Sequence, residues 1–313
     1  MKKRFLIVGI TLLLAGGLAF VVGMSTLGWN FLLLDSEVFT AKVYELETSP
    51  ERLASVSVDV RNAEIKVIEG SDVKIEYEES ERIKYDIEYD EKEQTLVMNE
   101  VHSIPNIFRL FDFHSQVITI TVPKVGTLSL ESTNGNIEVP SGVYDEIDIE
   151  TTNGTVEIRD VVAMRGVEVH TTNSRIVLSN VRSDEGTVEA YSTNGMIELE
   201  NIVAKSAKGK TTNGKIAVED VDVKTVSFIT TNSPIVCDRL KIGENAYFKS
   251  TNGNIKAEFV GNISDFGITG QTTNGNFIPG NISGGRKKVE CYTTNGDIKL
   301  TFSGHGGNES DHE

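Results

Sequence analysis

The side chains that most often carry chemistry are few in this 313-residue sequence, and they form no recognised motif. No two of its histidines lie at a spacing typical of metal ligands. The sequence has no Cys-x-x-Cys, no phosphate-binding P-loop and no Gly-x-Ser-x-Gly. We therefore expect no catalytic residue, no metal site and no cofactor. The five histidines are His102, His114, His170, His305 and His312.

Acidic side chains offer one remaining kind of chemistry. Pairs of carboxylates act as acid and base in glycoside hydrolysis, and polysaccharide-cleaving enzymes with a β-helix fold carry such groups on an outer wall. The alternation of side chains predicts Glu138, Glu157 and Glu198 on one outer wall, and Glu131 and Glu150 on another. Alternation alone also places charged side chains on a solvent-exposed face, and we favour this interpretation over a catalytic site. A carbohydrate-active enzyme stays as the alternative.

A repeat of about twenty residues positions these glutamates. Each copy has an Asn preceded by Thr, with Ser or Thr one place earlier and an apolar residue three places after the Asn. Gly follows the Asn in seven copies, and Ser174 or Ser233 follows it in the other two. A fixed period near twenty predicts one supersecondary unit stacked on copies of itself. The repeat asparagines are Asn134, Asn153, Asn173, Asn194, Asn213, Asn232, Asn252, Asn274 and Asn295.

Apolar residues alternate with polar residues on both sides of each Asn, as Ile147 and Ile149 do before Asn153. Asn-Gly between such runs also favours antiparallel hairpins. A hairpin series, however, has no reason to repeat one bend at a fixed period, whereas stacked coils bring like side chains within about 4.8 Å. We predict an all-β fold, a single-stranded parallel β-helix with right-handed connections and about 20 residues per coil, over residues 125–303.

The repeated bend carries its own expectations. We expect the asparagines to form an inward ladder in which Asn194 has partners on both sides and Asn295 is the end member. Gly should supply a positive φ at the corner. The Ser or Thr two places before each Asn should point inward and bond local backbone. The Thr just before the Asn should point outward, and a single such column is too narrow for an ice-binding face.

Cys237 and Cys291 fall at inward positions of the repeat, on different walls of coils three copies apart. Strand spacing then separates them by roughly 14 Å, beyond the reach of a disulfide. We expect two buried free thiols that pack as small hydrophobic residues.

Residues 51–124 alternate less regularly, and we interpret them as an irregular β region that caps the first coil. The run Arg61-Asn62-Ala63-Glu64-Ile65 resembles a worn copy of the repeat. The apolar stretch 107–114 is expected to form a lid over the core. The alternative is an interaction loop that presents Phe108, Leu110, Phe111 and Phe113 to a partner or a membrane surface.

The N-terminal segment predicts a membrane anchor. Residues 1–4 are basic, and residues 5–24 contain no charge over a length that can cross a bilayer. Basic residues place the N-terminus in the cytoplasm, so we expect a single-pass cell-membrane protein with its C-terminal domain extracytoplasmic. A juxtamembrane linker at 25–50 and a disordered tail at 304–313 complete the organisation. A cleaved signal peptide is the alternative, and both interpretations export the remaining chain.

The net charge of −16 argues against nucleic acid as a partner, because an acidic surface repels phosphate backbones. Residues 43–100 alone hold 17 acidic and 7 basic side chains. The membrane and a surface protein or polysaccharide remain as the expected partners.

The basic start, the single apolar segment, the Val122-Pro123 boundary and the repeated Thr-Thr-Asn-Gly motifs together resemble a bacterial family. It is the putative-adhesin family of β-strand-repeat surface domains of unknown function, and the resemblance covers roughly residues 50–302. The resemblance implies a surface-exposed β-helix, with adhesion or envelope-stress sensing suggested for some relatives and no catalytic residues. We therefore expect a non-catalytic binding, adhesion or sensing module, and keep a structural spacer as a further alternative.

Overall fold

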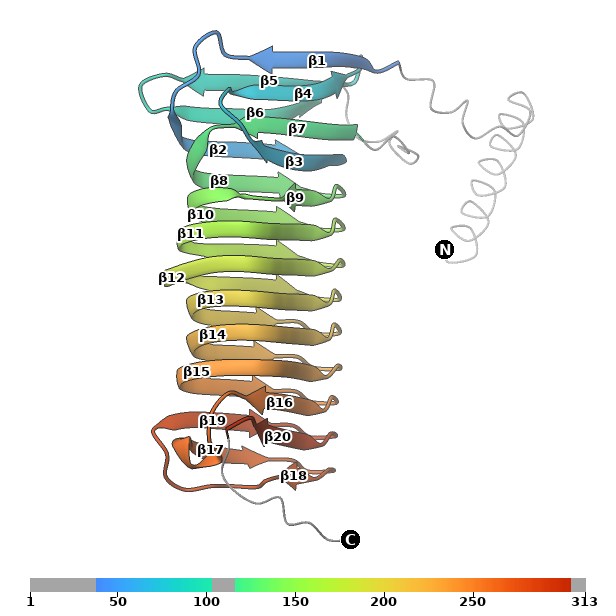
Figure 1. Ribbon diagram of the computed structural model, residues 1–313. Coiled ribbons are helices and arrows are strands. Elements are labelled where there is room, and N and C mark those ends of the chain that lie inside the picture. The colour runs from blue at the N-terminus through green and yellow to red at the C-terminus, as the bar shows by residue number, and fades with distance from the viewer. Residues whose placement is uncertain (1–37, 103–115, 305–313) are drawn as a thin grey trace, which may run out of the picture.

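Parallel stacking of short strands dominates the computed structural model, which describes residues 38–102 and 116–304 (Figure 1). The N-terminal strands are β1 Thr40–Glu45, β2 Arg52–Val60, β3 Ala63–Glu69, β4 Lys74–Glu79, β5 Ile83–Asp90, β6 Thr95–His102 and β7 Gln116–Val122. The central strands are β8 Lys124–Ser132, β9 Ile137–Val139, β10 Gly142–Thr151, β11 Val156–Thr171, β12 Ile176–Ser192, β13 Ile197–Lys210, β14 Ile216–Ile229 and β15 Ile235–Lys249. The C-terminal elements are β16 Ile255–Phe259, a 3-10 turn Ile263–Asp265, β17 Phe266–Gln271, β18 Phe277–Ile278, β19 Lys287–Tyr292 and β20 Ile298–Phe302.

Each coil of the central part repeats the course of the one before it. β10 to β15 pair in chain order and in parallel, with Val156 beside Ile176 and Ile176 beside Ile197. The parallel register excludes the hairpin series, in which neighbouring strands would be antiparallel. The predicted all-β parallel solenoid with about 20 residues per coil is confirmed.

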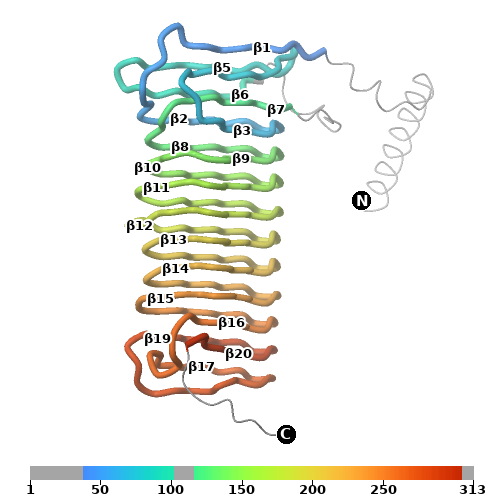
Figure 2. Tube along the Cα trace, in the orientation of Figure 1, coloured from blue at the N-terminus to red at the C-terminus, as the bar shows by residue number. Residues whose placement is uncertain are grey.

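The coils present three walls to solvent. The first wall is made by the strand segments before each repeat Asn, as in residues 146–151. The second wall follows the Asn-Gly corner, as in residues 156–159. The third wall follows a second corner, as in residues 161–165. We call one first-wall segment, its Asn corner and its second-wall segment a rung, and name it by its Asn. Figure 2 shows the rungs running straight along the stack.

Chain order and stacking order differ at both ends. At the N-terminal end, β2 lies between β8 and β6, and β3 lies between β9 and β7. At the C-terminal end, β19 lies between β15 and β17, and β20 lies between β16 and β18. The β2–β3 pair is therefore a true rung, as Arg61-Asn62-Ala63-Glu64-Ile65 had suggested.

The core is a continuous column of apolar side chains enclosed by the three walls. Val, Ile and Leu fill most of it, because β-branched side chains pack well on a pleated surface. The C-terminal end differs, since Phe228, Phe248, Phe259 and Phe266 are fully buried there. Phe228 fits beside Gly209 of the preceding rung, where a Cβ atom would lie 3.1 Å from its ring.

Both cysteines are buried and free, as expected. The predicted separation of three rungs is wrong. Cys291 belongs to the Asn295 rung and lies beside Phe248 of the Asn252 rung, because these two rungs stack directly. Cys237 belongs to the next rung along, so the two cysteines lie on rungs that are two apart. Burial raises the pKa of both thiols, which keeps them protonated and unreactive.

No helix among residues 38–102 and 116–304 is long and apolar enough to span a membrane. The predicted membrane segment at 5–24 and the apolar loop with Phe108, Leu110, Phe111 and Phe113 lie outside the described residues.

Candidate functional site

The repeat asparagines form one hydrogen-bonded ladder along the stack. Each Asn Nδ2 donates to the Oδ1 of the Asn in the neighbouring rung, as from Asn194 to Asn173 at 2.7 Å. Asn62 extends the ladder at the N-terminal end by accepting from Asn134. The bonds run through Asn62, Asn134, Asn153, Asn173, Asn194, Asn213, Asn232, Asn252, Asn295 and Asn274 in that order.

Two expectations about this ladder are wrong. All nine repeat asparagines are exposed rather than inward, because the Ser or Thr two places earlier takes the inward position. Asn295 is not the end member either. It bonds to both Asn252 and Asn274, so Asn274 ends the ladder. The ladder is thus a surface feature that ties rungs together.

The corner glycines are required for close approach rather than for a positive φ. None of the glycines that follow a repeat Asn has a positive φ. A Cβ at Gly195 would lie 1.5 Å from the carbonyl oxygen of Ser174, and one at Gly214 would lie 1.8 Å from that of Gly195. Each of these glycine corners therefore rests on the backbone of the preceding corner, where only hydrogen fits.

The inward Ser and Thr side chains join successive corners, as expected. Thr211 Oγ1 donates to the Gly195 carbonyl oxygen at 3.2 Å and accepts from the Gly214 N–H at 3.1 Å. Equivalent bonds recur at Ser132, Thr151 and Ser250. One buried hydroxyl thus satisfies both its own corner and the corner of the preceding rung.

A second ladder at the next corner was missed by sequence reasoning. Asp160, Asn180, Asn201, Asp220 and Arg239 all have φ between 50° and 54°, the left-handed region that Asn and Asp tolerate best. Asn201 donates to Asn180 at 2.6 Å, and Asn180 donates to Asp160 at 2.7 Å. The signal was present in the sequence, because each residue lies seven places after a repeat Asn.

The first wall has the most ordered arrangement of charge. Its N-terminal half presents the exposed carboxylates Asp59, Glu131, Asp148, Glu150 and Glu168. Glu131 and Glu150 are adjacent, as predicted, with Asp59 beside Glu131. Partial burial, then the charges of Asp59, Glu150 and Asp148, raise the pKa of Glu131. Partial burial and neighbours that include Glu168 likewise raise the pKa of Asp148.

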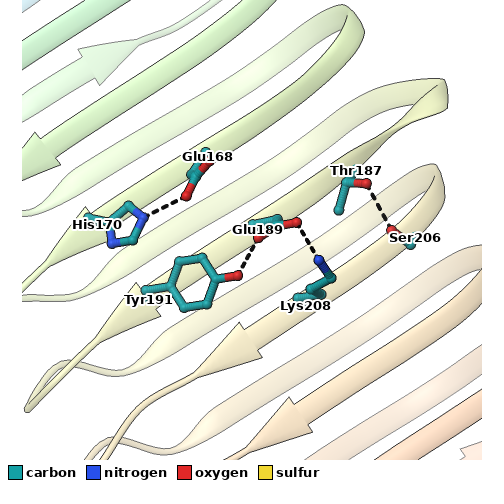
Figure 3. A network of polar contacts seen from close by, with 7 residues as sticks. All are labelled: Glu168, His170, Thr187, Glu189, Tyr191, Ser206 and Lys208. Atoms are coloured by element: carbon teal, nitrogen blue, oxygen red, sulfur yellow. Dashed lines mark hydrogen bonds and ion pairs between the residues drawn. The ribbon is translucent and has the colours of Figure 1, made fainter.

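The centre of the first wall holds aromatic side chains within a polar network (Figure 3). His170 and Tyr191 stack with their ring centroids 4.7 Å apart. His170 Nε2 contacts Glu168 Oε1 at 2.8 Å, and the Tyr191 hydroxyl donates to Glu189. Lys208 Nζ donates to Glu189 at 2.7 Å. Against the effect of its partial burial, the bonds from Lys208 and Tyr191 lower the pKa of Glu189, so this carboxylate stays charged.

The C-terminal half of the first wall is basic. Lys208, Lys210, Lys249 and Lys288 are exposed there, against the carboxylates Glu189 and Glu290. Tyr247 and Tyr292 lie side by side on the same wall, with ring centroids 6.1 Å apart. The first wall therefore changes from acidic to basic along the stack, with aromatic rings from its centre onward.

The second wall mixes its charges instead. Glu157 pairs with Arg159, and Glu198 pairs with Arg175. Glu138 lies beside Glu157 but also reaches Lys66 at 3.4 Å. The predicted wall carboxylates thus form ion pairs rather than an isolated acid pair. A shallow depression of about 200 Å³ lies on this wall, over Val177, Ala217 and Val236 and between charged neighbours.

Within residues 38–102 and 116–304, no group of His, Cys, Asp or Glu side chains is arranged to hold a metal ion. The model for the protein family described as Toastrack DUF4097 matches residues 53–301, which includes every rung of the stack. This chain belongs to that family. The repeat ladders and the first wall described above are thus features of a Toastrack domain.

One solved structure supports the fold. A putative adhesin from Parabacteroides distasonis ATCC 8503 shares 14% identity, with 82% of this chain and 98% of that chain covered and a TM-score of 0.52. A putative adhesin from Bacteroides fragilis NCTC 9343 also shares 14% identity, with 85% and 98% covered and a TM-score of 0.46. At this identity the first likeness shows the fold alone, and the second carries no argument. No curated protein matches the chain.

Proposed function

We propose that this Toastrack domain is a membrane-anchored, extracytoplasmic binding module that holds its partner against the first wall. The continuous first wall carries this proposal. It combines flat strands, half-buried aromatic rings and separated charges, which suit an extended protein or polysaccharide surface. The name of the Parabacteroides distasonis neighbour, a putative adhesin, fits a non-catalytic surface domain of this kind.

Photo-crosslinking on intact cells tests the choice of wall. A photoreactive side chain at Tyr247 on the first wall should capture a partner, whereas one at Val236 on the second wall should not. Both positions are half-buried and lie in well-formed strands, so they form a matched pair. Equal capture at both positions, or capture only at Val236, would contradict a role for the first wall. Capture at neither would favour a structural spacer.

The predicted topology supports the extracytoplasmic part of the proposal and has its own test. Lys2, Lys3 and Arg4 precede the uncharged segment 5–24, which favours a cytoplasmic N-terminus. Protease added to intact cells or protoplasts should therefore digest the residues that follow the linker at 25–50. Protection of those residues would overturn the orientation, and a mature chain starting near Ser25 would show cleavage instead of anchoring.

The acidic half of the first wall makes enzymatic activity the alternative to be tested. Glu131 and Asp148 have raised pKa values and lie on neighbouring rungs, as an acid and a base could. A screen against acidic and neutral polysaccharides should show no turnover. Turnover that Glu131→Gln or Asp148→Asn abolishes would replace the binding module with a carbohydrate-active enzyme.

A further inference from the structure

The charge pattern of the first wall is self-complementary. The N-terminal half is acidic through Asp59, Glu131, Asp148, Glu150 and Glu168, and the C-terminal half is basic through four lysines. Two copies placed face to face and antiparallel would set each acidic half against a basic half. Two parallel copies would set like charges against each other, which costs free energy. The pattern therefore selects one relative orientation.

We propose that the first wall pairs with the first wall of a second copy of this chain, in an antiparallel arrangement with two-fold symmetry. This inference rests on the proposed function, because it names the partner that occupies the same wall. A two-fold axis through the wall makes the interface isologous, so that one self-complementary surface serves both copies.

The dimensions of the first wall suit such an interface. Ten rungs at about 4.8 Å spacing give a length of about 45 Å, and six residues per strand give a width of about 20 Å. The product, about 900 Å² for each copy, is close to the roughly 800 Å² that each partner buries in a stable protein complex.

The aromatic pair lies where a two-fold axis would pass. His170 and Tyr191 belong to the fourth and fifth of the ten rungs, close to the midpoint of the stack. Near an axis, each ring meets its own counterpart from the second copy. Tyrosine is enriched at the centres of interfaces, where an apolar ring body is buried and its hydroxyl keeps a partner. The Tyr191 hydroxyl already has Glu189 as a partner.

The other walls lack this self-complementarity. The second wall alternates its signs through local ion pairs such as Arg239 with Glu219 and Lys256 with Asp238. The third wall exposes the apolar side chains of Val143, Val162 and Met164 at its N-terminal part. That patch is small and carries no charge pattern that would name its occupant.

Sedimentation equilibrium of the purified full-length chain in a mild detergent provides the first test. We expect a dimer whose dissociation constant increases as salt is added, because the charges that pair across the interface are exposed and screened in each copy. A chain that stays monomeric at low ionic strength and high concentration would overturn the proposal.

Charge reversal provides a sharper test. The variant Lys210→Glu/Lys249→Glu leaves more carboxylates than lysines in the C-terminal half of the first wall, and Glu131→Lys/Glu150→Lys replaces two of the five carboxylates of the acidic half with lysine. The dissociation constant of the dimer should increase by about tenfold or more for each variant alone. An equimolar mixture of the two variants should form the mixed dimer with the affinity of the unmodified chain. The control Lys256→Glu/Lys299→Glu makes the same change in net charge as Lys210→Glu/Lys249→Glu, but on the second wall, and should leave the dimer unchanged. Equal losses in the control and the first-wall variants would overturn the proposal.

Crosslinking between single introduced cysteines decides the orientation. Ser129 lies on the acidic half of the first wall and Ser227 lies on the basic half. A mixture of Ser129→Cys and Ser227→Cys chains should crosslink with each other, whereas crosslinks within either variant alone would indicate a parallel pair and overturn the inference. The native thiols are buried, so the unmodified chain serves as the blank. A monomeric chain that still captures a different molecule at Tyr247 would overturn the pairing and leave the proposed function intact.

Discussion

The two ends of the stack share one arrangement of the chain and differ in how they are closed. At each end, the outermost coil in chain order lies one rung inside the stack: β2–β3 lies under β6–β7, and β19–β20 lies under β17–β18. The N-terminal end then adds antiparallel strands, with β4 on β7, β1 on β4 and β5 on β6. The C-terminal end closes with a phenylalanine cluster and a returning segment.

The shared problem is the open edge of a parallel stack. An outermost rung leaves its N–H and C=O groups unpaired and its core uncovered. At the C-terminal end, Ile268 exchanges two backbone hydrogen bonds with Ile282, and the Gly270 N–H donates to Asn281 at 2.8 Å. Antiparallel strands at one end and a folded-back segment at the other satisfy the same groups. The repeat fixes the rungs between the ends but says little about how either end is closed.

The largest expected effect lies in the phenylalanine cluster. The Phe259 ring centroid lies 5.3 Å from that of Phe266 and 5.7 Å from that of Phe302. Phe259→Ala should lower the free energy of unfolding by about 3–5 kcal/mol, through lost burial and the cavity it leaves. Because contacts in a solenoid are between neighbouring rungs, the loss should be local. Hydrogen exchange should accelerate in β16–β20 and stay slow in β10–β13.

A central core substitution serves as the comparison for this local loss. Leu178 is fully buried in the middle of the stack, with neighbouring rungs on both sides. Leu178→Ala should accelerate exchange in the rungs on either side of it, since both lose contacts. If Phe259→Ala and Leu178→Ala gave the same exchange pattern along the whole chain, the stack would unfold as one unit and the contrast between ends and middle would fail.

The next effect concerns the corner glycines of the middle rungs. Gly195→Ala places a methyl group 1.5 Å from the Ser174 carbonyl oxygen, which the neighbouring rung holds in place. We expect a loss of about 3 kcal/mol in denaturant unfolding, because overpacking here forces backbone to shift.

Ser174→Ala is the matched control, since Ser174 occupies the same corner position in the preceding rung. It already has a Cβ, and its hydroxyl donates to the Asn153 carbonyl oxygen at 2.6 Å. Loss of that one bond should cost about 1 kcal/mol. A cost for Gly195→Ala no larger than that for Ser174→Ala would show that the corners can move apart freely.

The sequence predicted the interior rungs closely because one period governs them. Fixed spacing, alternation and the Asn-Gly bend together determine the parallel register from β8 to β15. The inverted order at the C-terminus was missed because the Asn spacing there is ordinary. Pro279 was the available signal: it lacks an N–H, so its rung cannot donate to a further rung at that position and suits the edge.

The first wall shows a different limit. Alternation predicted that Glu131 and Glu150 face solvent together, and they do. Alternation does not give the separation of acidic and basic halves, because it determines which residues face solvent and not the sign of their charge. The exposure of the asparagines was missed for another reason, because alternation gives only one inward position at the bend and the Ser or Thr occupies it.

The asparagine ladder provides a smaller effect that distinguishes the observed order from chain order. Asn194 and Asn295 each bond to two neighbours, whereas Asn274 donates to Asn295 alone. Asn194→Ala and Asn295→Ala should each cost about 1 kcal/mol in thermal or denaturant unfolding, because an exposed group that loses its partner can bond to water instead. Asn274→Ala should cost less. A smaller loss for Asn295→Ala than for Asn274→Ala would indicate that the rungs stack in chain order, and would contradict the position of the Asn295 rung between the Asn252 and Asn274 rungs.

The smallest effect is electrostatic and belongs to the acidic half of the first wall. Burial and neighbouring carboxylates raise the pKa of Asp148, so the folded chain binds this proton at a higher pH than the unfolded chain does. Ionised Asp148 therefore destabilises the fold above that raised pKa, and the penalty disappears as the pH falls through it. Asp148→Asn should increase the stability at pH 7 by no more than about 0.5 kcal/mol, with no gain in acid.

Asp220, at the second corner, should have the opposite effect on stability from Asp148. The hydrogen bond from Arg239 lowers the pKa of Asp220, so its ionised form stabilises the fold above the ordinary pKa of Asp, and this contribution is lost as the pH falls through the lowered value. Asp220→Asn keeps a residue that tolerates the left-handed φ of 52° but should decrease the stability at pH 7. Thermal unfolding of both variants across the acidic pH range should give curves that diverge from the unmodified chain in opposite directions and converge with it in acid. A decrease in stability at pH 7 for Asp148→Asn would contradict the crowding of this carboxylate in the acidic half of the first wall, and an increase for Asp220→Asn would contradict its stabilising bond from Arg239.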